Sequence, residues 1–200
     1  MEVLPIQIAS NKEQILCRPH AQAVCTICDV DWSEHNALAA TLKSTNGDTP
    51  PPNVTNPIRN QQVNRLREEG NKHFKAGKYE EAIRFYSMAI DMSWSRPLWE
   101  PMAFQFIREE VTTALSNRAA AYTARGQYVD ALVDSEMCTR LRRDWQKGWF
   151  RKGKALVGLN RAKEALEAFE LGRQFDPESE ELRKAIEEVK AGFERGEYYE

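Results

Sequence analysis

The chain lacks the features expected of a membrane, secreted or nucleic-acid-binding protein. None of its apolar runs approaches the roughly 20 residues needed to span a bilayer. Its first residues, MEVLPIQIAS, have neither the basic region nor the long apolar core of a signal peptide. The formal net charge is −2, whereas a general nucleic-acid binder carries a basic excess. We therefore expect no direct membrane span, no nucleic-acid partner and a location in the cytosol.

Signatures of catalysis do not stand out either. The sequence shows no clear nucleophile–base motif and no glycine-rich phosphate loop, so we predict that the protein is not an enzyme. Cysteine is scarce, with four residues in a chain of 200. In a reducing cytosol these cysteines are expected to be thiols or metal ligands rather than disulfides.

Three of the four cysteines gather with a histidine in one short stretch. Cys17, His20, Cys25 and Cys28 form the pattern C-x2-H-x4-C-x2-C. Thiolates and imidazole are the ligands of tetrahedral zinc, so the stretch is a candidate site for a structural zinc ion. The alternative is a set of buried free thiols in a small hydrophobic patch. We expect no other cofactor, and we expect His35 on the surface of a helix.

The N-terminal part of the chain has a mixed composition. Residues 1–43 include a candidate edge strand at 3–8, which contains a proline, and a short helix at 33–43 with Ser33 as its N-cap. Residues 44–59 are rich in Pro, Asn, Thr and Ser and are predicted to be an extended linker. A segment as short as residues 1–43 cannot easily build its own hydrophobic core. We expect it to fold against the rest of the chain or against a second polypeptide.

Residues 60–200 have the periodicity of helices almost throughout. An insert near 94–111 interrupts them, and it contains SWSRPLWEP. The predicted helices cover 60–76, 79–93, 103–125, 128–142, 146–158, 161–174 and 178–195.

Three segments of this helical part align with one another. Each has a small residue at its start, and another small residue follows twelve positions later. These pairs are Gly70 with Ala82, Ala119 with Ala131, and Gly153 with Ala165. The second and third copies are 34 residues apart and the first two are 49 apart. The insert accounts for the longer spacing between the first two copies.

This period resembles the tetratricopeptide repeat, and Trp149 and Pro177 also occupy positions typical of that family. The resemblance implies an all-α superhelix of three repeats, closed by a capping helix at 180–195 and preceded by a small mixed segment. The alternative is three unrelated helical hairpins. In each repeat a slot that is often leucine holds a charged residue: Glu69, Arg118 and Lys152.

Several polar residues in the predicted first helices of the repeats lie at positions where their charges are unfavourable for the helix. Arg67 and Asn71 are four residues apart, as are Lys147 and Arg151. Like charges at this spacing cost a helix roughly 0.2–0.5 kcal/mol, and Lys147 lies in a first turn, where the helix dipole disfavours a cation. A bound anion would relieve both conflicts, and two neighbouring carboxylates would also use the amides of Asn71 and Asn117. The alternative is that these are ordinary solvated charges.

The same residues resemble the dicarboxylate clamp of chaperone-binding tetratricopeptide domains. All five positions of that clamp are matched: Arg67, Asn71, Asn117, Lys147 and Arg151. The resemblance implies that the ligand is the C-terminal Glu-Glu-Val-Asp tail of a cytosolic heat-shock chaperone, with the seventy-kilodalton class favoured.

The order of N-terminal module, proline-rich linker, first repeat and RPLWEP insert also resembles the soluble tetratricopeptide subunits of fungal post-translational translocation complexes. This resemblance implies a membrane-anchored partner subunit and a peripheral place on the cytosolic face of the endoplasmic reticulum. It also implies a role in recruiting chaperones with their precursor proteins to the translocon. The alternatives are a structural scaffold subunit of a membrane complex and a free soluble cochaperone.

Overall fold

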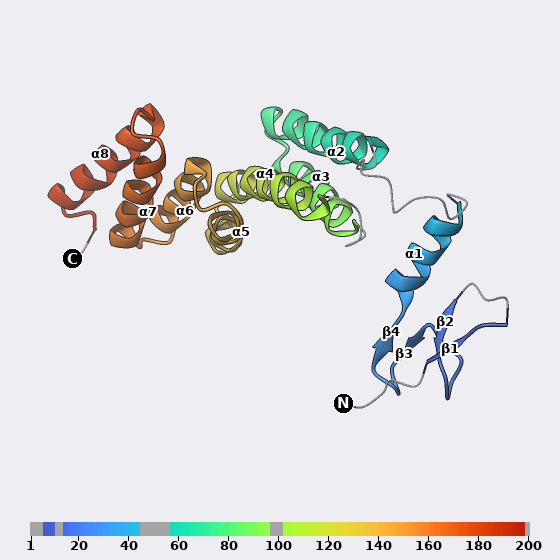
Figure 1. The fold of residues 1–200 in the computed structure, drawn as a ribbon. Helices are drawn as coiled ribbons and strands as arrows, with labels where there is room; N and C mark the ends of the chain where they lie inside the picture. Colours follow the sequence, from blue (N-terminus) through green and yellow to red (C-terminus); the bar gives the residue numbers. More distant parts are fainter. Residues whose placement is uncertain (1–5, 11–13, 45–56, 97–101, 199–200) are drawn as a thin grey trace. The chain divides into compact units, whose positions relative to one another are not determined.

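The structure, a computed structural model, describes residues 6–10, 14–44, 57–96 and 102–198. It divides into two units, residues 1–56 with 96–104 and residues 57–95 with 105–200, and Figure 1 shows their elements. Within the described ranges, no helix combines the length and the apolar character needed to cross a membrane.

The N-terminal unit contains two short hairpins followed by a helix. Its elements are β1 (Ile6–Ile8), β2 (Ile15–Cys17), β3 (Val24–Cys25), β4 (Val30–Asp31) and α1 (Ser33–Ser44). Antiparallel pairing joins β1 to β2 and β3 to β4. Asn36 fastens α1 to β2, because its Oδ1 accepts from the Ile15 backbone nitrogen at 2.6 Å and its Nδ2 donates to the Ile15 carbonyl at 3.0 Å.

Sequence patterns described this unit only in part. The predicted strand at 3–8 is present as Ile6–Ile8, and residues 1–5 lie outside the described ranges. The prediction that Ser33 is an N-cap is wrong, because Ser33 is already helical. Instead the Asp31 carboxylate accepts a hydrogen bond from the Ser33 backbone nitrogen at 2.8 Å. Hydrogen bonds from the Ser33 hydroxyl and backbone lower the pKa of Asp31, as suits an acid at a helix N-terminus.

The second unit is a series of helices that follow one another along the chain (Figure 1). They are α2 (Pro57–Lys75), α3 (Tyr79–Trp94), α4 (Ala103–Ala124), α5 (Tyr128–Leu141), α6 (Gln146–Gly158), α7 (Ala162–Phe175) and α8 (Glu180–Glu194). The predicted helices agree with these within three residues at each end. The largest difference is at α2, which begins at Pro57, inside the stretch predicted to be linker. Proline is favoured in a first turn because its missing N–H costs no helical hydrogen bond there.

A left-handed turn recurs between the two helices of each repeat. Its central residues are Gly77, Gly126 and Asn160, with φ of 73°, 74° and 58°. The next residue donates its backbone N–H to the carbonyl five positions earlier, at 2.9–3.0 Å: Lys78 to His73, Gln127 to Tyr122, and Arg161 to Leu156. This is the Schellman pattern of helix ends. The turns at 126 and 160 are 34 residues apart, which confirms the repeat period.

The small residues of the repeats allow close helix packing. A Cβ added at Gly70 would lie 2.5 Å from the Tyr86 ring, and one added at Gly153 would lie 2.3 Å from the Phe169 ring. Both rings are buried, so neither has free space into which it could shift. Glycine at these positions therefore fixes where each aromatic ring lies.

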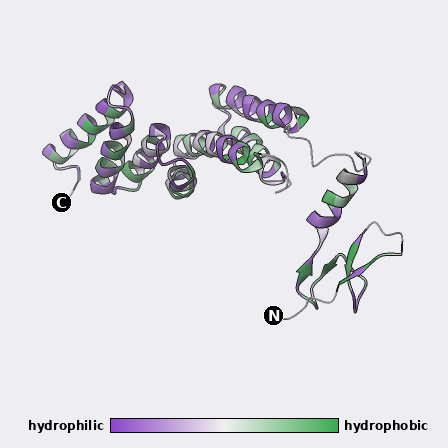
Figure 2. Ribbon diagram, viewed as in Figure 1, coloured by the Kyte–Doolittle hydropathy of each residue, from purple (hydrophilic) through white to green (hydrophobic). Residues whose placement is uncertain are grey.

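The last helix covers the end of the stack, as predicted. Leu182, Ile186 and Val189 are buried, and Phe193 packs against the same cluster. Ser179 caps the helix, since its side chain accepts from the Leu182 backbone nitrogen at 3.5 Å. Figure 2 shows hydrophobic and hydrophilic residues alternating along α7 and α8, which is the pattern of helices buried on one face.

The charged residues at the leucine slots all have ion partners. The pairs are Glu69 with Lys72 at 2.7 Å, Arg118 with Asp134 at 2.7 Å, and Lys152 with Glu136 at 2.6 Å. The Arg118 pair is bidentate: Nε and Nη2 donate to the two oxygens of Asp134 at 2.7 and 2.8 Å. The third guanidinium nitrogen donates to the Ser87 hydroxyl at 2.8 Å. Arg118 therefore links helices α3, α4 and α5.

Candidate functional site

Two of the predicted clamp residues lie in direct contact. The Asn117 Nδ2 on α4 donates to the Asn71 Oδ1 on α2 at 3.0 Å. The Tyr86 hydroxyl on α3 donates to the same Oδ1 at 2.8 Å. An amide oxygen has two lone pairs, so both are used, and the Asn71 side chain is held in one orientation. Among the described residues, none accepts from the Asn71 Nδ2, which leaves its two donors for a ligand.

Tyr86 is a further residue of the candidate site, and it is not among the residues predicted from the sequence. Burial raises the pKa of Tyr86 to about 12, although the positive charges of Arg151 and Arg67 oppose the rise. Tyr86 therefore stays protonated at neutral pH and remains a donor to Asn71. The influence of the two arginines on its hydroxyl indicates that α2 and α6 both present a cation toward this region. The signal in the sequence was the Gly70–Tyr86 spacing, which places the ring beside Asn71.

Arg151 is a partly buried cation without a counterion. Burial lowers the pKa of its guanidinium, and Glu181 offsets this only in part. Within the part of the chain that the structure describes, no carboxylate lies within ion-pair distance of Arg151. Its Nε is buried and has no hydrogen-bond partner. Buried charges are normally paired, so this arrangement favours an anionic ligand.

The other two predicted cations are Lys147 and Arg67. Lys147 lies exposed in the first turn of α6, and none of the described carboxylates pairs with it. Arg67 donates from Nη2 to the Asn64 Oδ1 at 3.1 Å. It also lines a pocket of about 270 Å³ between α2 and α4, beside Glu109 and Thr113. The cations thus differ in exposure, since Lys147 is exposed whereas Arg67 and Arg151 are partly buried.

Each of these groups can donate to a carboxylate. Asn71, Asn117 and Arg151 offer donors from the three repeats, and Lys147 adds an exposed charge. Charge-assisted hydrogen bonds to a carboxylate are about twice as strong as neutral ones.

The cysteine and histidine residues of the N-terminal unit form a second, separate cluster. Its four donor atoms, one each from Cys17, His20, Cys25 and Cys28, all lie within 4.8 Å of one another. Desolvation and the neighbouring thiols raise the pKa of Cys28 to about 11. Desolvation opposes ionisation at Cys17 too, but hydrogen bonds from the Gln22 backbone and from Cys25 outweigh it and lower that pKa to about 7. His35 is outside the cluster and exposed on α1, where it packs against Trp32, as predicted.

Comparison with known sequences gives two groups of relatives. No family model matches the chain. It is 38% identical over 115 residues to the ER protein translocation subcomplex subunit sec67 of Schizosaccharomyces pombe, covering 58% of this chain and 59% of that protein. It is 32% identical over 133 residues to the Hsp70-Hsp90 organising protein of Plasmodium falciparum, covering 66% of this chain and 47% of that one. The chain thus spans about half the length of these curated relatives.

Solved structures of the same fold include a domain bound to a chaperone peptide and a chain of the Sec complex. The first TPR of Spaghetti (RPAP3), bound to the HSP90 peptide SRMEEVD, matches with a TM-score of 0.56 and 26% identity, covering 66% of this chain and 94% of that one. A chain of the Sec complex from S. cerevisiae matches with a TM-score of 0.62, covering 95% of this chain and 98% of that one; at 23% identity this likeness concerns the fold alone. The chain therefore has a tetratricopeptide-repeat fold and is similar in sequence to a fungal ER translocation subunit.

Proposed function

We propose that this protein is a non-catalytic adaptor that binds the acidic C-terminal tail of a cytosolic heat-shock chaperone. In this proposal Arg67, Asn71, Asn117, Lys147 and Arg151 hold the main-chain and side-chain carboxylates of the terminal aspartate. The observations that carry the proposal are that Arg151 is partly buried without a counterion and that the amide of Asn71 is held in one orientation. The two groups offer donors that the described residues leave unused.

Similarity to proteins that are linked to chaperones also supports this proposal. One solved neighbour, the Spaghetti (RPAP3) domain, is bound to an HSP90 peptide that ends in EEVD. One relative in sequence is an Hsp70-Hsp90 organising protein. We propose a chaperone of the seventy-kilodalton class as the physiological ligand, with affinity on the order of micromolar, because a short terminal peptide makes a small interface.

A binding titration tests the proposal. The full chain is titrated with a fluorescent peptide that ends in Glu-Glu-Val-Asp and with the same peptide amidated at its C-terminus. We expect saturable binding of the free acid and at least roughly tenfold weaker binding of the amide, because the amide lacks one of the two carboxylates that need charge-assisted donors. Equal affinity for both peptides, or binding of neither, would contradict the clamp.

We further infer that the adaptor is held at the cytosolic face of the endoplasmic reticulum by a membrane-anchored partner subunit, and that it recruits chaperones with their precursor proteins to the translocon. Its similarity to an ER translocation subunit supports this. A surface feature agrees with it: Val129, Val133 and Met137 form an exposed apolar stripe on α5, with the two valines each 63% exposed. Val133 also lines a pocket of about 290 Å³ with Leu132 and Leu156, and four charged residues complete the lining of that pocket. Such a contiguous apolar patch is typical of an interaction surface.

Co-purification tests this second part. The tagged chain is incubated with detergent-solubilised endoplasmic reticulum membranes from its source cells, and we expect it to capture an integral membrane protein. Val133→Glu should reduce capture by about tenfold or more, since it places a charge in an apolar contact. Lys163→Glu, at an exposed position on α7, is the matched control and should capture normally. Tail binding without any membrane partner would favour a free cochaperone instead.

A further inference from the structure

The cysteine and histidine cluster has the dimensions of a metal site. His20 Nδ1 lies 3.8 Å from the Cys17 Sγ, 3.3 Å from the Cys25 Sγ and 3.2 Å from the Cys28 Sγ. In tetrahedral zinc, with Zn–S near 2.3 Å and Zn–N near 2.0 Å, a sulfur and a nitrogen ligand are about 3.5 Å apart. All four cysteines of the chain are free thiols. The donor atoms therefore surround a space of the size that one zinc ion occupies.

Two turns of the same kind deliver these donors. Cys17 and His20 are separated by two residues, and so are Cys25 and Cys28. The residue after each second ligand is left-handed: Ala21 has φ of 52° and Asp29 has φ of 50°. This conformation is uncommon outside glycine, and alanine has no side chain that would favour it. Its occurrence at equivalent places in both turns indicates one shared requirement, which is to direct two donor atoms to the same side.

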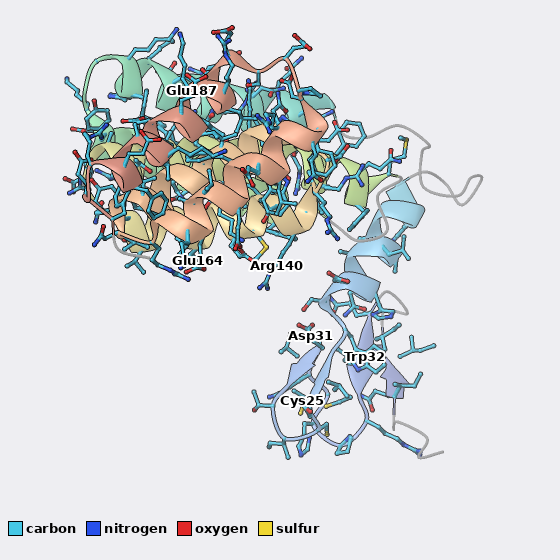
Figure 3. The ribbon with its side chains drawn as sticks, turned by 90° about the vertical axis from the view of Figure 1, so that its left-hand side faces the viewer. Cys25, Asp31, Trp32, Arg140, Glu164 and Glu187 are labelled. Carbon is cyan, nitrogen blue, oxygen red and sulfur yellow. The ribbon has the colours of Figure 1, made fainter. Side chains whose placement is uncertain are left out.

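The described residues of 6–44 in the N-terminal unit form no ordinary hydrophobic core. Within the described part of residues 6–44, only Cys17 and Cys25 are buried, each 1% exposed. Large apolar side chains of the hairpins, such as Ile8 and Ile27, are instead exposed. Figure 3 shows Cys25 in the hairpin region with sulfur atoms beside it. Strands of two and three residues without a core need another source of stability.

We propose that a zinc ion, bound by the sulfurs of Cys17, Cys25 and Cys28 and by the Nδ1 of His20, is the structural core of the N-terminal unit. One cysteine belongs to the β1–β2 hairpin and two to the β3–β4 hairpin and its turn, so the ion joins the two hairpins. Three soft thiolates and an imidazole in a closed tetrahedron select zinc over magnesium or calcium. This site is independent of the tail-binding proposal and stands if that one fails.

Metal content tests the proposal first. The full chain is purified from zinc-supplemented medium, and its metal is measured by plasma mass spectrometry. We expect one zinc per chain, and cobalt substitution should give the visible absorption bands of a tetrahedral thiolate site. Cys28→Ser and His20→Ala should lower the zinc content to background. Cys138→Ala and His35→Ala remove the same residue types outside the cluster and should leave one zinc bound.

Folding of the unit tests the second half of the proposal. Removing zinc with a strong chelator should collapse the amide NMR dispersion of residues 14–31, while the helical circular dichroism of the repeats is kept, because a metal that supplies the core supplies the folding free energy. Zinc at background in the wild type, or a disulfide within the cluster found by mass spectrometry of the purified chain, overturns the metal site. A dispersed spectrum that chelation leaves unchanged overturns its structural role.

Discussion

We expect Arg151→Met to abolish tail binding while making the protein more stable. The guanidinium of Arg151 is partly buried, and burial lowers its pKa because no described carboxylate pairs with it. Losing a desolvated charge pair in an interface typically costs 2–5 kcal/mol, so affinity for the free-acid peptide should fall by about 30-fold or more. Methionine keeps the apolar stem but has no charge to desolvate, so the free energy of unfolding should rise by about 1–2 kcal/mol.

The measurement combines peptide titration with urea unfolding on the same samples. Arg140→Met is the matched control, since Arg140 points outward from the repeats in Figure 3 and is exposed, with its partner Glu136 at 3.3 Å. It should change binding by less than about twofold and stability by less than about 1 kcal/mol. If the Arg151→Met protein unfolds more easily than the wild type, Arg151 has a structural role. If it binds the peptide with normal affinity, Arg151 is not part of the binding site.

Arg151 and Lys147 should contribute differently to peptide binding because they differ in burial. Lys147 is exposed, so its contribution to binding should be smaller and should fall as salt rises, whereas a buried pair is screened much less. A binding site with one exposed and one partly buried cation combines attraction at long range with discrimination at short range. Selection for binding would then retain Arg151 even though it weakens the free fold, as is common at functional sites.

Sequence patterns predicted the repeats well because the relevant signals are local and periodic. Small residues such as Gly70 and Gly153 recur at fixed positions, and each faces an aromatic residue sixteen positions later, Tyr86 or Phe169. The same spacing of sixteen links Arg118 to Asp134. That pair lies one position before the small-to-aromatic register, which in the second repeat leads from Ala119 to Ser135, so the repeat pattern does not predict it.

Other features left no comparable pattern. The β-strands of the N-terminal unit are two or three residues long, too short for an alternation of polar and apolar residues to be visible. The role of Tyr86 depends on a hydrogen bond to Asn71 between different helices. Arg151 and Lys147 share a helix and a charge, and the sequence alone does not distinguish them. Their difference in burial arises from the packing of the third repeat.

We also expect Asp134→Ala to be strongly destabilising. The carboxylate of Asp134 is 6% exposed and pairs with an Arg118 side chain that is 19% exposed. Removing one partner of a buried ion pair leaves the other charge uncompensated, at a typical cost of 3–5 kcal/mol. Arg118 would also remain attached to Ser87, which cannot neutralise it. Urea unfolding monitored by far-ultraviolet circular dichroism should show the loss as a lower midpoint.

The double variant Arg118→Leu with Asp134→Leu separates the charge from the packing. Leucine is frequent at the Arg118 slot in repeats of this kind, and replacing both members of a buried pair by apolar residues is often neutral or stabilising. We expect the double variant to recover most of the stability that Asp134→Ala loses. Glu136→Ala breaks the more exposed pair with Lys152, whose side chains are 37% and 24% exposed, and should cost no more than about 1 kcal/mol. If it cost as much as Asp134→Ala, burial would not be the reason for the difference. If the double variant were as unstable as Asp134→Ala, the bidentate geometry that joins α3, α4 and α5 would matter more than the unpaired charge.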